Sequence, residues 1–122
     1  MDIEKTRRYY DSLTDDDLCD CDSCRNFRMQ IRETYPRIAE YLDTLGIDIA
    51  KPFETWSIEL ENGELLYPET MYLILGEPSG SFPVQIDDID VHLTDSHPYV
   101  DMDDPHFVIE LSSFRLKDLM IK

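Results

Sequence analysis

The spacing of apolar residues changes once along this chain, near residue 47, and this change limits the folds open to it. Before that point the spacing is three or four positions, as one face of a helix requires. After it, apolar and polar residues alternate, as in half-buried strands. No helical segment separates the later strands, which argues against parallel pairing. The sequence predicts an α+β fold with N-terminal helices packed on an antiparallel β-sheet or small β-sandwich. The apolar or small residues that show the helical spacing are Cys24, Phe27, Ile31, Tyr35, Ile38, Leu42 and Leu45.

Helices are expected at residues 3–13 and 24–45. Pro36 should divide the second run, because proline lacks an amide proton and disfavours a helical residue before it. Asp22 or Ser23 offers a side-chain oxygen to cap the helix start. Gly46 follows the last periodic residue and fits a left-handed C-terminal cap.

Strands are expected from residue 56 onward. Trp56, Ile58 and Leu60 alternate with polar residues and predict a strand with these three side chains buried. Asn62-Gly63 supplies the positive φ angles of a tight hairpin turn, and Pro68 interrupts the next strand. Residues 71–75 are nearly all apolar and indicate a central buried strand, and further strands are expected at 84–86, 89–93 and 106–111.

The length of 122 residues suits one domain, with a helical part at 1–46 and a strand-rich part at 47–122. The 27 acidic and 11 basic residues give a net charge of −16, and no Lys or Arg lies between residues 52 and 114. Nucleic acid and anionic membrane surfaces both require basic side chains, so neither is expected as a partner. The expected partner is instead a basic protein, which the acidic surface would attract.

The sequence shows no apolar leader at its start and no apolar span of about 18 residues. The cytoplasm is therefore the expected compartment.

All three cysteines lie within six residues, as Cys19-Asp20-Cys21-Asp22-Ser23-Cys24. An odd number of cysteines without a secretory leader argues against a disulfide framework. Three thiols at this spacing, at a helix start, predict a zinc site. For the fourth ligand we favour His106, because strand ends are held more firmly than loop tips. The alternatives are His92, His97, Asp20, Asp22 or water.

Two other interpretations of the cysteines stay open. Five nearby aspartates should raise the thiol pKa values and oppose thiolates, so the cysteines could be ordinary thiols, with Cys24 packed in the helix face. Cys21 and Cys24 could also form a redox dithiol. A calcium site is not expected at the acidic residues 101–104, because they lack the central Gly and distal Glu of the calcium loop signature.

The run Leu18-Cys19-Asp20-Cys21-Asp22-Ser23-Cys24-Arg25-Asn26-Phe27 is followed by Tyr35-Pro36, Leu45-Gly46-Ile47-Asp48 and Lys51-Pro52-Phe53-Glu54. This pattern resembles an uncharacterised family of small proteins from Gram-positive bacteria, over residues 9–54. The resemblance implies a bacterial, cytoplasmic protein and carries no catalytic residue with it.

These observations lead us to expect a non-enzymatic, acidic interaction protein with a structural zinc site. One form of this hypothesis is an immunity-type inhibitor of a basic toxin, because opposite charge accelerates encounter. The alternative from a different class is a thiol-based redox or metal-dependent enzyme that uses the same cysteines. No pair of carboxylates or catalytic triad can be singled out from the sequence.

Overall fold

A computed structural model describes residues 1–119 of the protein. The helices confirm the predicted division at Pro36, which occupies the first turn of α3. Gly46 follows α3 with a φ of +85°, and the amide of Ile47 donates to the carbonyl of Leu42, so α3 ends as predicted. The predicted cap of α2 is wrong, because Cys21 takes the cap position. The helical elements are α1 (Ile3–Ser12), the short 3₁₀ helix η1 (Asp15–Asp17), α2 (Asp22–Thr34) and α3 (Pro36–Thr44).

Eight strands form two antiparallel sheets, which confirms the predicted α+β class. The larger sheet has the order β1-β4-β7-β6-β5 and the smaller has the order β2-β3-β8. The strands are β1 (Glu54–Thr55), β2 (Ile58–Glu59), β3 (Glu64–Tyr67), β4 (Thr70–Leu75), β5 (Val84–Ile86), β6 (Ile89–Thr94), β7 (His106–Leu111) and β8 (Phe114–Lys117).

One long two-stranded ribbon connects the sheets. Tyr67 lies opposite Phe114 in the smaller sheet and Thr70 lies opposite Leu111 in the larger one, so the register is unchanged across the gap. Pro68 lies in that gap, where its missing N–H interrupts the ladder without shifting it. The predicted interruption at Pro68 is therefore confirmed, and it takes the form of a break rather than a bulge.

The predicted strand with buried Trp56 and Ile58 is wrong. Both side chains are 44% exposed. The chain crosses here from β1 of the larger sheet to β2 of the smaller one, and Ser57 turns inward to hydrogen-bond Ser23 on α2 at 2.6 Å. Of Asn62 and Gly63, only Gly63 has a positive φ, +83°, which fits a longer hairpin loop than the tight turn expected.

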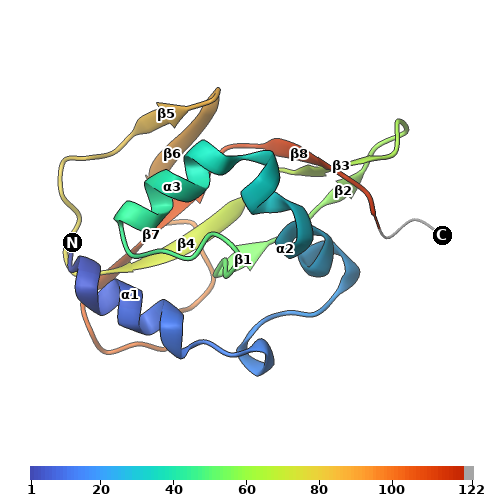
Figure 1. The fold of residues 1–122 in the computed structure, drawn as a ribbon. Coiled ribbons are helices and arrows are strands. Elements are labelled where there is room, and N and C mark those ends of the chain that lie inside the picture. Colours follow the sequence, from blue (N-terminus) through green and yellow to red (C-terminus); the bar gives the residue numbers. More distant parts are fainter. Residues whose placement is uncertain (120–122) are drawn as a thin grey trace.

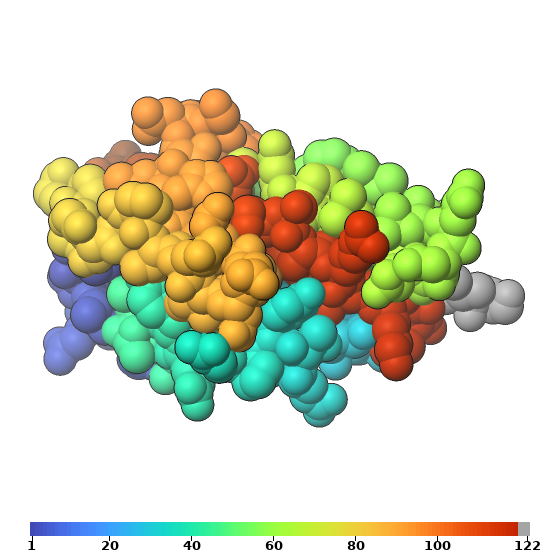
Figure 2. Space-filling view, turned by 90° about the horizontal axis from the view of Figure 1, so that it is seen from above, coloured from blue at the N-terminus to red at the C-terminus, as the bar shows by residue number. Residues whose placement is uncertain are grey.

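The helices cover one face of the sheets, and the connection at residues 95–105 covers the opposite face (Figures 1 and 2). On the helical side, Tyr72, Ile74 and Ile109 join the main core with Phe27. On the other side a smaller core forms where Val100 and Met102 pack on the sheet; its buried members are Met71, Leu73, Leu75 and Val108. All six residues of β4 are buried, which confirms the predicted central strand.

Side chains of α1 complete the hydrogen bonding of β4 where β1 ends. The Tyr10 hydroxyl donates to the carbonyl of Leu73 at 2.8 Å and accepts from its amide at 3.0 Å. The Thr6 hydroxyl accepts a hydrogen bond from the amide of Leu75 at 3.0 Å. The carbonyl of Leu75 in turn accepts one from the amide of Asp2 at 2.9 Å. Backbone groups on the open edge of β4 are thereby satisfied without a neighbouring strand. Across residues 1–119, no helix has the length and apolar character needed to cross a membrane.

Candidate metal centre

Cys19, Cys21 and Cys24 come together at the start of α2. Their three Sγ atoms all lie within 4.8 Å of one another, and they form the one converging group of three or more His, Cys, Asp or Glu ligands within residues 1–119. Cys19 and Cys21 are exposed, whereas Cys24 is only 7% exposed and packs beneath them. The structure thus brings together the three cysteines that the sequence analysis selected.

Backbone bonds in the 14–25 segment produce this convergence. Thr14 and Asp17 bond reciprocally around η1, which turns the chain before the cysteines. The carbonyl of Cys21 accepts the first hydrogen bond of α2 from the Arg25 amide at 2.9 Å. One turn further along, the guanidinium of Arg28 donates to the carbonyl of Cys19 at 2.6 Å. Both exposed cysteines are therefore held through their backbone carbonyls.

The three thiols differ in acidity. The pKa of Cys19 is lowered, mainly because the backbone N–H of Cys21 donates to its sulfur, with further hydrogen bonds from the thiols of Cys21 and Cys24. Asp20 acts in the opposite direction, as expected, but these hydrogen bonds outweigh it. The expected rise in the thiol pKa values is therefore wrong for Cys19, whose pKa is lowered overall. Burial holds the pKa of Cys24 well above the usual range, and its bonds to Cys21 and Cys19 raise it further.

A pocket of about 290 Å³ opens beside the cysteines. Pro52 and Phe53, from the segment that leads into β1, and Thr55 of β1 line it. Asp17 and Glu54 also line it, but their carboxylates are not part of the converging group of ligand atoms. The predicted ligands Asp20 and Asp22 lie on either side of Cys21 and are exposed.

The histidines lie outside the sulfur group. His106, the favoured fourth ligand, opens β7 opposite Leu75, and its Nδ1 lies 2.8 Å from the carbonyl oxygen of Asp104. The structure does not bring it to the cysteines. His92 lies 2.8 Å from Glu110 on the neighbouring strand. The ring of His97 contacts Phe53, which itself lines the cysteine pocket, at a centroid distance of 6.3 Å.

Two aspartates of the strand-rich part form ion pairs with basic residues of the helices. Asp87 pairs with Arg37 at 2.8 Å and Asp104 pairs with Lys5 at 3.2 Å. Exposed acidic residues in the described part of the chain thus tie the helices to loops of the strand-rich part.

Comparison with known proteins identifies no relative: no family model matches the chain, and neither a curated protein nor a solved structure matches it. The resemblance of residues 9–54 to a bacterial family stays a prediction of the sequence.

Proposed function

We propose that the protein is an acidic interaction module whose fold is stabilised by one zinc ion bound to Cys19, Cys21 and Cys24. The observation that carries this proposal is the convergence of three sulfur atoms within 4.8 Å. Zinc–sulfur bonds of about 2.3 Å place the sulfurs of a tetrahedral site about 3.8 Å apart. Small side-chain rotations would bring the three thiols to that spacing.

The surroundings favour a soft cation with a structural role. Thiolates select zinc over magnesium and calcium, which prefer oxygen ligands. The neighbouring aspartates attract a cation, and binding it displaces the thiol protons, including that of the buried Cys24. The ion would connect the exposed segment that carries Cys19 to the first turn of α2. Water, or a carboxylate of Asp17 or Glu54 in the adjoining pocket, would complete the tetrahedron.

The test is the zinc content of protein purified without chelator, together with thermal unfolding before and after zinc removal. We expect one zinc per chain. Zinc at about one hundred times its dissociation constant stabilises the folded state by about 2.7 kcal/mol. For a chain of 122 residues this raises the melting temperature by about 10 °C.

Cys19→Ser is the informative variant, because Cys19 is exposed and its replacement leaves the core intact. It should lose both the zinc and the stabilisation. Glu61→Gln, at an exposed residue of the loop between β2 and β3 and away from the cysteines, is the control and should keep both. A protein without zinc whose three thiols titrate freely when zinc is added would overturn the proposal.

One observation favours a second candidate, a thiol–disulfide exchange activity. Cys19 is exposed, its sulfur accepts hydrogen bonds, and two further thiols lie beside it. Its thiolate would attack a substrate disulfide and release one substrate thiolate. Cys21 or Cys24 would then displace the second and close an intramolecular disulfide, so that the substrate is reduced by two electrons. Incubation with oxidised glutathione distinguishes the candidates: exchange predicts a mass loss of two hydrogens per chain, whereas the zinc-bound protein stays unchanged.

A further inference from the structure

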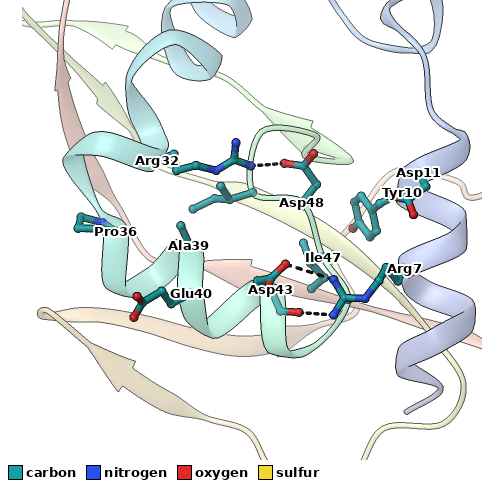
Figure 3. A pocket seen from close by; sticks show the side chains of 12 residues that line it. Arg7, Tyr10, Asp11, Arg32, Pro36, Ala39, Glu40, Asp43, Ile47 and Asp48 are labelled. Carbon is teal, nitrogen blue, oxygen red and sulfur yellow. Dashed lines mark hydrogen bonds and ion pairs between the residues drawn. The ribbon is translucent and has the colours of Figure 1, made fainter.

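A second hollow, which none of the cysteines lines, lies between α1 and α3 (Figure 3). It has a volume of about 430 Å³, within the range of about 300–1,000 Å³ typical of small-ligand sites. Its floor is apolar: Tyr10, Ile47 and Ile49 are almost fully buried, and Ala39 of α3 adds a half-buried methyl group. We call this hollow the α1–α3 groove.

An ion pair closes each end of the α1–α3 groove. Arg7 bonds both the carboxylate and the carbonyl of Asp43, at 3.2 and 2.8 Å, across one end. Arg32 pairs with Asp48 at 2.7 Å across the other. Figure 3 shows these two pairs on opposite sides of the hollow, with Tyr10 on a third side. Both guanidinium groups already have carboxylate partners, which offset their positive charge at the two ends of the groove.

Two further carboxylates line the groove and form no ion pair within residues 1–119. Asp11 lies on α1 and Glu40 on α3, on the two opposing helices. Neither forms a hydrogen bond or ion pair with any residue in the described part of the chain. The groove therefore combines an apolar floor with an excess of negative charge, and the whole chain carries a net charge of −16.

We propose that the α1–α3 groove binds an arginine or lysine side chain presented by a basic partner protein. Such a side chain has an aliphatic stem that packs on apolar surface and a cationic head that stays near water. The stem would lie on Ile47 and Ala39, and the head would pair with Asp11 or Glu40. The volume admits one or two side chains rather than a folded element. This site does not depend on the metal centre.

The test is titration with N-acetylarginine amide and N-acetyllysine amide, followed by amide chemical shifts in NMR spectra. The signals of Ala39, Ile47 and Ile49 should move, and N-acetylglutamate amide should leave them unchanged. The two cationic probes also show which head group the site prefers.

The double variant Asp11→Asn, Glu40→Gln should bind the preferred probe at least fivefold more weakly. Glu61→Gln, Asp95→Asn is the matched control, because it removes two exposed carboxylates outside the groove and changes the net charge equally. It should change the affinity by less than twofold. Equal weakening in both variants would mean that attraction is general to the acidic surface, and would overturn the site. Shifts confined to other residues, or binding of the glutamate probe, would overturn it as well.

Discussion

Gly46 and Gly63 provide a matched pair of substitutions that separates backbone strain from steric exclusion. Their φ angles are nearly equal, +85° and +83°. A Cβ atom at Gly46 would lie 2.5 Å from the carbonyl oxygen of Ile3 and 2.9 Å from the amide nitrogen of Arg7, both in α1. A Cβ atom at Gly63 would meet nothing within 4 Å. Replacement by alanine therefore imposes the same strain at both positions and a collision at only one.

The structure gives a magnitude for each variant. A left-handed conformation costs an alanine about 1–2 kcal/mol, so Gly63→Ala should destabilise the fold by about that amount. Gly46→Ala adds the cost of displacing α1, about 1–3 kcal/mol for overpacking, because the contacted atoms are backbone and cannot rotate away. The total is about 2–5 kcal/mol. At about 4 °C per kcal/mol for 122 residues, the melting temperature should fall by about 8–20 °C.

Thermal unfolding followed by circular dichroism measures both variants, with urea denaturation at 25 °C as a second measure. Gly80→Ala is the baseline, since its Cβ would have open space and its φ lies outside the left-handed region. We expect Gly80→Ala to be close to neutral, and Gly63→Ala to lie between it and Gly46→Ala. Equal destabilisation by the Gly46 and Gly63 variants would refute the close approach of α1 to the end of α3.

Three further predictions concern hydrogen bonds and protons. Tyr10→Phe leaves the amide and carbonyl of Leu73 unpaired in the core, so it should lower the free energy of unfolding, measured by urea denaturation, by about 2–4 kcal/mol. Tyr99→Phe, at a side chain that is 86% exposed, is the control and should leave it unchanged. Burial raises the pKa values of Tyr10 and Tyr72 well above 10, so above pH 10, where the unfolded chain alone ionises, these two groups should lower the stability by up to about 2.7 kcal/mol per pH unit. A urea midpoint that stays flat from pH 9 to 11 would contradict this. Zinc affinity should weaken as pH falls from 8 to 6 in competition with a chromophoric chelator, because the thiolates must be reprotonated; affinity independent of pH would exclude sulfur ligands.

The spacing of apolar residues predicted the helices and the central strand well, because a spacing of three or four residues fits a helix and a short apolar run between turns fits a buried strand. The division at Pro36 and the end at Gly46 follow from the geometry of single residues. The cysteine convergence was also within reach, since spacing places Cys21 and Cys24 in one helical turn. In each case the pattern that carries the prediction lies within a short stretch of the sequence.

Features that depend on distant partners were not predictable. Trp56 alternates like a buried residue, but the chain changes sheets at this point, which no local pattern indicates. Asn26 is polar and yet fully buried, because four groups satisfy its amide: Gln30, the Tyr67 hydroxyl, the Lys117 carbonyl and the Leu119 amide. The position of His106 depends on the register of β7 against β4, which alternation alone leaves undetermined. The α1–α3 groove arises from the packing of two helices, and its charged residues carry no sequence motif.

Two hydroxyl groups of α1 and the backbone amide of Asp2, just before α1, seal the edge of β4, and this arrangement bears on how the protein resists aggregation. The segment Thr70–Leu75 reads TMYLIL, which has no charge, no proline and a high preference for extended structure. Detachment of α1 would uncover unpaired N–H and C=O groups along this segment, which another chain could then pair with to seed fibrils. Substitutions that loosen α1 should therefore promote self-association before the rest of the fold is lost.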